Sequence, residues 1–494
     1  MKKEWFKDKY NIMFLVILIA AFAIRLYYFF LTKNQALWWD EAEYALRAKA
    51  FAFYTPLTGF SPERELVVPL FFSLLLRLGV GEIGLRLIQV LVSTLTVFMT
   101  YIVFSKIINK KVALIATFAM AFFWLHLFFT ERVLLYLWAP LIYLLIVYFF
   151  YTGFLHNNKK HLIIFAILAS LGLQTYFSIG FLLLGLFLYL LVIERLSLFN
   201  QKRTWVTLLI FFLVLAPYAI YSQITYGFPI PRMAIGYKAV TQEAGAGLPG
   251  LLGYINMFPS RVGWIFTILL SLGILYFIYK LALGVGIKGY LEKNKKWLLI
   301  FTCFFIPFMA YTLYGTVGGS GTFYDAFILP VFPFAFSFAG LFLERIYNFG
   351  KKYNKIIILL LISILLIFSA YISIKDADIS IKAKITSYDS VKEAGLWLKD
   401  NTNKGDIIIS RSLPQNTYYS ERATYDFAKN ETLLTQFISE KKPKFVVDSI
   451  WENTQPWIHQ YVSQHNETLT PVMGYYSQIQ GQKTLTLIIY KVKE

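Results

Sequence analysis

About eleven apolar runs, most of them close to 20 residues long, constrain the fold of this chain more than any other feature. A helix needs roughly 20 apolar residues to cross the hydrocarbon of a membrane. The runs lie near 11–31, 82–105, 112–129, 133–151, 161–177, 179–193, 204–222, 262–280, 297–316, 326–343 and 355–374. Charged residues make up only 15% of the chain, against roughly a quarter in a soluble protein. The sequence therefore predicts a polytopic all-α membrane protein with about eleven transmembrane helices.

Basic clusters predict how these helices are oriented. The clusters are Lys2/Lys3/Lys7/Lys9, Lys106/Lys110/Lys111, Lys159/Lys160, Arg195/Lys202/Arg203, Lys280/Lys288/Lys293/Lys295/Lys296 and Arg345/Lys351/Lys352/Lys355. With the spans above, all of them fall on one side, which the positive-inside rule assigns to the cytoplasm. We therefore expect a multi-pass plasma-membrane protein with a cytoplasmic N-terminus. The connections 32–81 and 223–261 and the C-terminal tail then lie outside.

The net charge of +19 does not indicate nucleic-acid binding. The tail has nearly equal numbers of basic and acidic residues, so the excess positive charge lies in the inner loops. Such loops orient spans and contact anionic lipid headgroups. The single cysteine, Cys303, lies in an apolar run and offers neither a disulfide nor a cysteine metal site.

The composition changes abruptly near residue 376, which predicts two domains, 1–375 in the membrane and 376–494 outside. The tail has a helical pattern over 387–398 and apolar strand patterns over 406–410, 444–448 and 484–490. At roughly 120 residues it is long enough for a small α/β domain. It contains no glycine-rich phosphate loop and no nucleophile motif, so we assign it no chemistry.

Two further outer segments have a predicted role. The apolar stretch 66–80 is too short to cross the membrane and contains Arg77, which favours an interfacial or re-entrant helix. The connection 223–261 is rich in Gly, Pro and Ala, and such a long loop is either disordered or a functional lid. Its basic residues Arg232 and Lys238 favour contact with an anion.

Ionisable residues gather at the outer ends of the predicted spans. They are Asp40, Glu41 and Glu43 after the first span, Glu82 and Arg86 at the second, Glu131 and Arg132 before the fourth, and Tyr324 and Asp325 before the tenth. Carboxylates beside a membrane are costly and usually functional. The predicted spans are nearly free of interior charge. A coupled transporter is expected to have charges or broken helices near the bilayer midplane, so this counts against transport.

Each of these groups also has a purely structural interpretation. Asp40 and Glu43 have the spacing of a helix capping box, with Asp40 as the N-cap. Glu43 and Arg47, like Glu82 and Arg86, have the i,i+4 spacing of helix ion pairs. His126 lies among aromatic residues and is more readily explained as a core histidine than as a metal ligand. Asp40 and Glu41 together are harder to explain this way, because a cap requires only one carboxylate.

Glycosyl transfer from a lipid-phosphate sugar fits these groups. A carboxylate can act as general base toward an acceptor hydroxyl. Arginines bind a phosphate leaving group in a bidentate way. An aromatic-rich transmembrane groove accepts a polyprenyl tail.

The sequence resembles the GT-C superfamily of polytopic glycosyltransferases, in the branch of protein O-mannosyltransferases and the lipid A aminoarabinose transferase. The resemblance spans roughly 11–345 and rests on Asp40-Glu41 followed by Tyr44-Ala45-Leu46-Arg47, Val68-Pro69-Leu70-Phe71-Phe72, Gly81-Glu82-Ile83-Gly84-Leu85-Arg86-Leu87 and Ile328-Leu329-Pro330-Val331-Phe332-Pro333. The chain departs from the family at Val67, where members often have histidine. It also departs at Tyr324-Asp325, where they often have a basic residue.

The resemblance implies an inverting transfer of a sugar, a hexose such as mannose, from a polyprenyl- or dolichyl-phosphate carrier. The acceptor would be a hydroxyl of a protein, lipid or glycan at the outer face. By match to the family's first-loop acid, Asp40 is the expected general base. Glu41 is expected to contact the substrate or a metal, and Glu131 to be a supporting acid. Arg86 and Arg132 are the expected phosphate contacts.

Further substrate contacts are expected from Trp39, Glu43, Tyr44, Tyr324 and Asp325. No cofactor is expected, and no metal site, because residues two apart on a helix, as in Glu41-Ala42-Glu43, do not face one ligand. The alternative function is a polyprenyl-linked sugar flippase, or another lipid-binding membrane protein without chemistry.

Overall fold

A computed structural model describes residues 3–58, 64–229, 253–284, 290–317, 325–479 and 481–493. The chain divides into two compact units. The membrane unit contains Met1–Phe29, Ile88–Glu131 and Leu135–Ser380, and the outer unit contains Phe30–Leu87, Arg132–Leu134 and Ile381–Glu494. The first outer connection is thus grouped with the C-terminal domain, although the sequence had suggested a simple boundary at 375/376. The loop centred on 230–252, with Arg232 and Lys238, lies outside the described residues, as does Tyr324.

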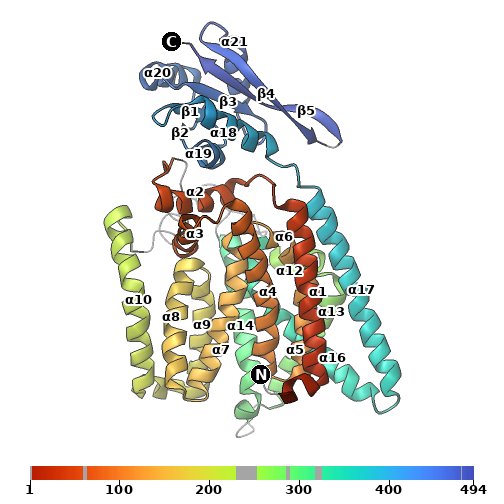
Figure 1. The fold of residues 1–494 in the computed structure, drawn as a ribbon. Helices are drawn as coiled ribbons and strands as arrows, with labels where there is room; N and C mark the ends of the chain where they lie inside the picture. The colour runs from red at the N-terminus through yellow and green to blue at the C-terminus, as the bar shows by residue number, and fades with distance from the viewer. Residues whose placement is uncertain are drawn as a thin grey trace. The chain divides into compact units, whose positions relative to one another are not determined.

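Helices, most of them long and apolar, make up the membrane unit (Figure 1). They are α1 (Lys9–Thr32), α4 (Glu82–Ile107), α5 (Lys110–Phe122), α6 (Trp124–Thr130), α7 (Trp138–Phe154), α8 (Lys159–Thr175), α9 (Ile179–Glu194), α10 (Lys202–Tyr226), α12 (Gly253–Val262), α13 (Trp264–Leu283), α14 (Tyr290–Val317), α15 (Asp325–Ile328), α16 (Phe332–Gly350) and α17 (Lys355–Lys382). The 3-10 helices η1 (Lys3–Lys7), η2 (Leu135–Leu137), η3 (Arg195–Asn200) and η4 (Leu329–Val331) complete the described elements of this unit.

The described residues contain 9 helices long and apolar enough to cross a membrane, or 10 if the bent pair α5 and α6 is one span. This confirms a polytopic membrane protein but corrects the expected count of eleven. The predicted span 161–177 corresponds to α8, which has 17 residues, lies at the short end of the range that crosses the hydrocarbon, and is not among the nine. The predicted span 112–129 is bent by 53° between α5 and α6.

Helix α16 lies at the centre of the membrane unit, and α17 lies at its lipid-facing periphery. In the apolar part of the span Asp325–Gly350, which contains α16, 89% of the residues are buried. In the apolar part of α17 only 11% are buried. Phe332, Phe336 and Phe338 of α16 pack edge-on or tilted against rings of α12, α13 and α14 and against Phe123, which lies between α5 and α6. Helix α13 approaches α16 closely at Gly273, where a Cβ atom would lie 2.1 Å from the carbonyl oxygen of Phe338. Only glycine permits this contact between the two backbones.

The outer unit contains a five-stranded sheet in the order β2-β1-β3-β5-β4. Its strands are β1 (Ile407–Ser410), β2 (Ala423–Tyr425), β3 (Phe445–Ser449), β4 (Leu469–Ile479) and β5 (Gln482–Val492). Strand β1 pairs in parallel with β2 and β3, whereas β5 is antiparallel to β3 and β4. The helices of this unit are α2 (Trp39–Phe53), α3 (Val67–Arg77), α18 (Asp389–Asn401), α19 (Leu413–Ser420), α20 (Glu431–Lys441) and α21 (Pro456–Gln464).

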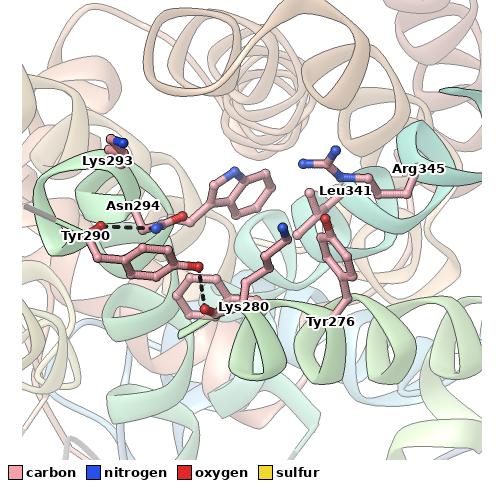
Figure 2. A pocket seen from close by; sticks show the side chains of 9 residues that line it. Tyr276, Lys280, Tyr290, Lys293, Asn294, Leu341 and Arg345 are labelled. Carbon is pink, nitrogen blue, oxygen red and sulfur yellow. Dashed lines mark hydrogen bonds between the residues drawn. The ribbon is translucent and has the colours of Figure 1, made fainter. Parts of the chain in front are cut away.

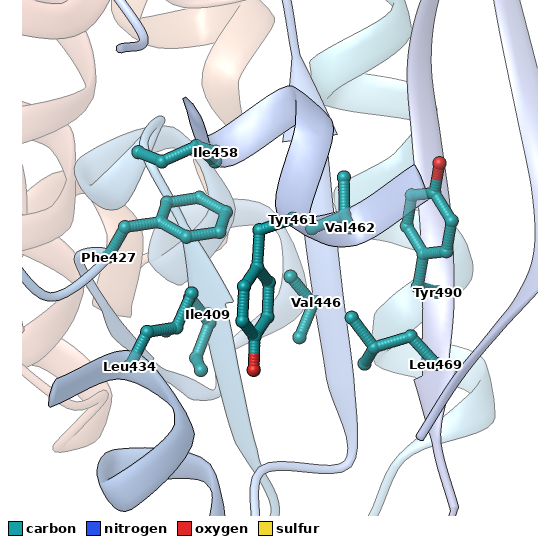
Figure 3. Packing of buried hydrophobic residues seen from close by; sticks show 9 residues of the cluster. All are labelled: Ile409, Phe427, Leu434, Val446, Ile458, Tyr461, Val462, Leu469 and Tyr490. Carbon is teal, nitrogen blue, oxygen red and sulfur yellow. The ribbon is translucent and has the colours of Figure 1, made fainter. Parts of the chain in front are cut away.

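Alternating side chains of the strands form one core on each face of the sheet. Ile409 and Val446 pack with Leu434 of α20 and Tyr461 of α21 on one face (Figure 3). Ile408, Phe445, Val447 and Ile489 pack with Val391 and Leu398 of α18 on the other face. This two-residue alternation confirms the small α/β domain expected from the sequence. The short helix α3 lies where an interfacial or re-entrant segment was expected, and its 11 residues are too few to cross a membrane.

We expect Leu434→Ala to destabilise the C-terminal domain by about 2–5 kcal/mol, because Leu434 is fully buried in the core of Figure 3. The matched control is Leu433→Ala, since Leu433 is adjacent on the same helix and 45% exposed. Its expected cost is below about 0.5 kcal/mol. Hydrogen exchange of peptides from 389–493 in the full-length protein measures both. Equal protection in the two variants would contradict this packing.

We also expect the stability of this domain to depend on pH through Glu452, a half-buried residue after β3. Burial raises the pKa of Glu452 to about 7, although hydrogen bonds from Gln415 and Tyr388 act in the opposite direction. A raised carboxyl pKa means that the folded state binds this proton more tightly than the unfolded state. Stability should therefore fall as pH rises from about 4.5 to about 7. Glu452→Gln should remove much of that fall in thermal unfolding, whereas Glu467→Gln, at an exposed residue, should leave it intact.

Candidate active site

The acidic cluster forms the first turn of α2. Trp38 has extended backbone angles at the N-cap, and the helix begins at Trp39. Glu41 accepts a hydrogen bond from the backbone N–H of Trp38 at 3.1 Å. The predicted capping box is thus shifted by two residues, since Glu41 and not Glu43 reaches back to the start of the helix. Carboxylates in a first helical turn are stabilised by the positive end of the helix dipole.

Glu41 is fully buried and joins three segments of the outer unit. Its Oε1 accepts a hydrogen bond from the backbone N–H of Val133 at 2.8 Å. Arg86, on α4, and Arg132 each lie 3.4 Å from a different oxygen of this carboxylate. Arg132 also stacks over the Trp38 ring, 3.4 Å from its centroid. Sequence reasoning paired these two arginines with phosphate, but here both are buried around Glu41.

Arg86 also extends the ionic network toward the C-terminal domain. It contacts Glu82 at 3.5 Å, which is the i,i+4 pair expected from the sequence, and donates to the Gln35 carbonyl at 2.9 Å. Lys392 of α18 lies 3.3 Å from the same Glu82 carboxylate. The network therefore connects the start of α4 to α18 through Glu82.

Arg64 is a site residue that the sequence reasoning missed. It lies 2.6 Å from the carboxylate of Asp40 and 2.6 Å from that of Glu43. Its guanidinium also stacks over Tyr44 and donates to the Tyr44 hydroxyl at 3.4 Å. The Asp40 side chain is 36% exposed, whereas those of Glu41 and Glu43 are 0% and 1% exposed. Asp40 is thus the accessible carboxylate among the three.

The C-terminal domain holds α2 through α19. Lys49 of α2 forms an ion pair with Glu421 at 2.7 Å, and Lys399 of α18 contacts the same carboxylate at 2.8 Å. Burial favours a higher pKa for Glu421, but hydrogen bonds from the two lysines and their charges outweigh it and lower the pKa to about 2. The Tyr419 hydroxyl accepts a hydrogen bond from the Leu37 N–H at 2.9 Å, just before α2 begins.

A second predicted group lies in the membrane unit. Asp325 forms an ion pair with Arg261 of α12 at 2.5 Å. Arg261 also lies over the ring of Trp124, whose indole N–H donates to the Arg261 carbonyl at 2.5 Å. Where the family often has a basic residue next to this position in sequence, the chain instead brings Arg261 to Asp325 from another helix. The sequence contained Arg261, but no local pattern pointed to it.

Arg25 is the other residue that sequence reasoning missed. It is fully buried in α1 and donates to Ser93 at 2.7 Å and to the carbonyls of Ala21 and Ala121 at 2.9 Å. His126 is buried beside it, with Nδ1 3.0 Å from the guanidinium, so the histidine belongs to a polar core cluster. Glu131 is buried in the same unit and interacts electrostatically with Arg25. Arg25 and the bend between α5 and α6 are thus a charge and a break within predicted spans, and the argument against transport treated such features as nearly absent.

The remaining predicted residues are placed as follows. Trp39 is half-buried in the first turn of α2, and Tyr44 is buried on the same helix, where its hydroxyl donates to Glu65 at 3.4 Å. Among the residues that the structure describes, no cluster of three or more His, Cys, Asp or Glu side chains has the arrangement of a metal site. The acidic residues of α2 are instead bound by arginines.

Comparison with known proteins agrees with this architecture. Residues 62–221 match the family model of dolichyl-phosphate-mannose-protein mannosyltransferases. Among solved structures, ArnT from Cupriavidus metallidurans bound to undecaprenyl phosphate matches with a TM-score of 0.62 and 12% identity, over 97% of this chain and 97% of that one. The Archaeoglobus fulgidus oligosaccharyltransferase in complex with Zn and sulfate matches with a TM-score of 0.61 and 12% identity, over 96% of this chain and 73% of that one. No protein with a curated function matches the chain in sequence.

The two solved structures confirm the fold expected from the sequence, and the family model agrees with the resemblance over residues 62–221. The matching family and both solved structures are glycosyltransferases, as expected from the sequence.

We expect Glu41→Ala to destabilise the outer unit strongly, by about 3–5 kcal/mol, because it leaves two arginines buried without their shared carboxylate. Glu41→Gln should cost less, since an amide oxygen can still accept from the Val133 N–H. Thermal unfolding of the purified protein measures both, with Glu393→Ala at an exposed site as the control. A wild-type melting temperature for Glu41→Ala would show that Glu41 does not hold these segments together.

Proposed function

We propose that this protein is an integral membrane glycosyltransferase that moves one sugar from a polyprenyl-phosphate carrier to an acceptor hydroxyl at the outer face. The observation that supports it best is the accessible carboxylate of Asp40 within a cluster whose other carboxylates are buried and bound by arginines. The sugar is a hexose such as mannose, and the acceptor is a protein, lipid or glycan. The N-terminus is cytoplasmic, so the C-terminal domain faces outward.

Asp40 acts as general base in this proposal. Its carboxylate takes the proton of the acceptor hydroxyl while the acceptor oxygen attacks the anomeric carbon of the donor sugar. The bond from the anomeric carbon to the phosphate oxygen breaks, and the carrier leaves as a polyprenyl monophosphate. One displacement of this kind inverts the anomeric centre. Arg64 holds the Asp40 carboxylate at 2.6 Å and orients it toward the acceptor.

The leaving phosphate requires cations, and the structure changes which arginines are the better candidates. Arg86 and Arg132, the predicted contacts, are buried around Glu41, so we propose that they fix Glu41 and through it the start of α2. Arg64 and Arg261 are 16% and 30% exposed and can reach a ligand. We therefore propose Arg64 as a phosphate contact of the outer unit. Arg261, which Asp325 orients, is proposed separately as an anion contact of the membrane unit. Trp39, Glu43, Tyr44 and Tyr324 remain proposed substrate contacts, and Glu131 remains a proposed supporting acid.

We expect Asp40→Asn to lower the rate of sugar transfer by roughly 10²- to 10⁴-fold, which is the usual contribution of general-base catalysis. The melting temperature should change little, because Asp40 is partly exposed. Transfer from a radiolabelled polyprenyl-phosphate sugar in membranes measures the rate. Asp400→Asn, which changes an exposed aspartate of α18, should retain full activity. A near wild-type rate for Asp40→Asn would sink the assignment of the base.

We further expect transfer to proceed in the presence of a chelator. A monophosphate leaving group can be stabilised by arginines without a divalent ion. The same assay with EDTA, followed by Mg²⁺ or Mn²⁺, measures this requirement. Loss of transfer in EDTA that either ion restores would show that a metal is needed.

The second candidate function is a flippase for a polyprenyl-linked sugar. Two observations favour it: the buried Arg25 cluster in α1 and the bend between α5 and α6, since charges and broken helices inside spans are typical of transporters. The two functions separate in the Asp40→Asn protein. If the protein is a flippase, the Asp40→Asn variant should still move the labelled lipid between the leaflets of reconstituted vesicles. The wild-type protein should then show no sugar transfer.

A further inference from the structure

A basic pocket lies between the ends of three helices of the membrane unit, away from the residues discussed above. It has a volume of about 250 Å³ and is lined by Tyr276, Phe277, Lys280, Tyr290, Lys293, Asn294, Trp297, Leu341 and Arg345. The lining residues come from the C-terminal ends of α13 and α16 and the N-terminal end of α14. The basic clusters at these helix ends belong to the side predicted to be cytoplasmic.

Three cations enter this pocket from three different helices. Figure 2 shows Lys280 reaching between Tyr290 and Tyr276, with Lys293 and Arg345 at opposite sides. The Arg345 guanidinium lies over the Tyr276 ring, 5.1 Å from its centroid. Within the part of the chain that the structure describes, none of the three cations forms an ion pair with a carboxylate. By contrast, Arg203, in another basic groove, is neutralised by Glu194 at 2.6 Å.

Aromatic residues hold the pocket in shape. Trp297 packs against Phe338 of α16 with ring centroids 5.5 Å apart, and Phe277 packs against Phe301 at 5.4 Å. The Tyr290 hydroxyl donates a hydrogen bond to the Lys280 carbonyl, which ties the start of α14 to the end of α13. The pocket is therefore closed by rings toward the bundle and is cationic at its mouth.

Next to the pocket, α13 presents an apolar stripe that faces outward. Its members are Trp264, Ile268, Leu272, Leu275, Tyr279 and Leu283, each between 38% and 69% exposed. Their spacing of three or four residues places them on one side of the helix along its whole length. The stripe ends beside Lys280. An acyl chain on this stripe would bring its headgroup to the pocket, which a soluble phosphate would not need.

We propose that this pocket binds the phosphate headgroup of an anionic phospholipid from the inner leaflet. Its three cations suit a headgroup with two phosphates better than one with a single phosphate. Basic pockets between transmembrane helices on the cytoplasmic side are suited to such headgroups. The pocket would fix the ends of α13, α14 and α16 relative to one another, independently of any sugar transfer.

Native mass spectrometry of the full-length protein, titrated with cardiolipin, phosphatidylcholine or inorganic phosphate, tests this site. The pocket variant combines Lys280→Gln, Lys293→Gln and Arg345→Gln. At roughly a fivefold contribution per cation, cardiolipin binding should weaken about 100-fold. The control combines Lys106→Gln, Lys352→Gln and Lys355→Gln, which removes the same charge from exposed residues outside the pocket. Its binding should weaken less than about fivefold.

Three outcomes decide the proposal. A selective loss of cardiolipin in the pocket variant, with phosphatidylcholine unaffected, supports it. Equal losses in pocket and control variants show non-specific surface attraction and overturn it. Displacement of cardiolipin by inorganic phosphate at equal concentration shows a soluble-phosphate site and overturns the lipid assignment. Because three substitutions can disturb folding, Lys280→Gln and Arg345→Gln are also measured singly, and each is expected to weaken cardiolipin binding about fivefold. Wild-type binding in both single variants would overturn the proposal.

Discussion

The buried carboxylate of Glu41 is the interaction on which the arrangement of the acidic site depends. It accepts from backbone N–H groups of Trp38 and Val133 and contacts Arg86 and Arg132. A buried carboxylate without partners would be very costly, so the three segments must meet for any of them to be stable. Asp40 is adjacent in sequence and shares the same helical turn. The position of Asp40 therefore depends on the contacts that hold Glu41.

The spans and the C-terminal strands could be predicted because each is a local pattern. Apolar runs predicted the membrane helices, and the alternation of Ile408 and Ile409 between two cores followed from the period of a strand. Helix α8 was predicted as a span from its apolar run, and its 17 residues place it at the short end of the range that crosses a membrane. The bend between α5 and α6 was missed because the sequence stays apolar through it. Hydropathy along the sequence does not show the direction of a helix axis.

The site was predicted only as far as its residues are neighbours in sequence. Asp40 and Glu41 were adjacent and unusual, so the pattern indicated both, but it could not separate an accessible carboxylate from a buried one. Arg64 follows in the same loop without helical spacing, and its pairing depends on how the loop folds back. Arg261 meets Asp325 across 64 residues. Arg25 was overlooked because a single charge hardly changes the average of an apolar run.

The contact between Lys49 and Glu421 has a consequence for how the protein is made. The two residues are 372 positions apart (421 − 49), and ribosomes add ~5–20 residues per second, so on the order of 20–75 s pass between their synthesis. During that interval α2 has been synthesised but the C-terminal domain that contacts it has not. Because α17, the last of the described membrane helices, ends at Lys382, all of them can be inserted while α2 still lacks its contact with Glu421. A chain truncated before α19 would therefore be inserted into the membrane but would lack the C-terminal contacts that hold α2.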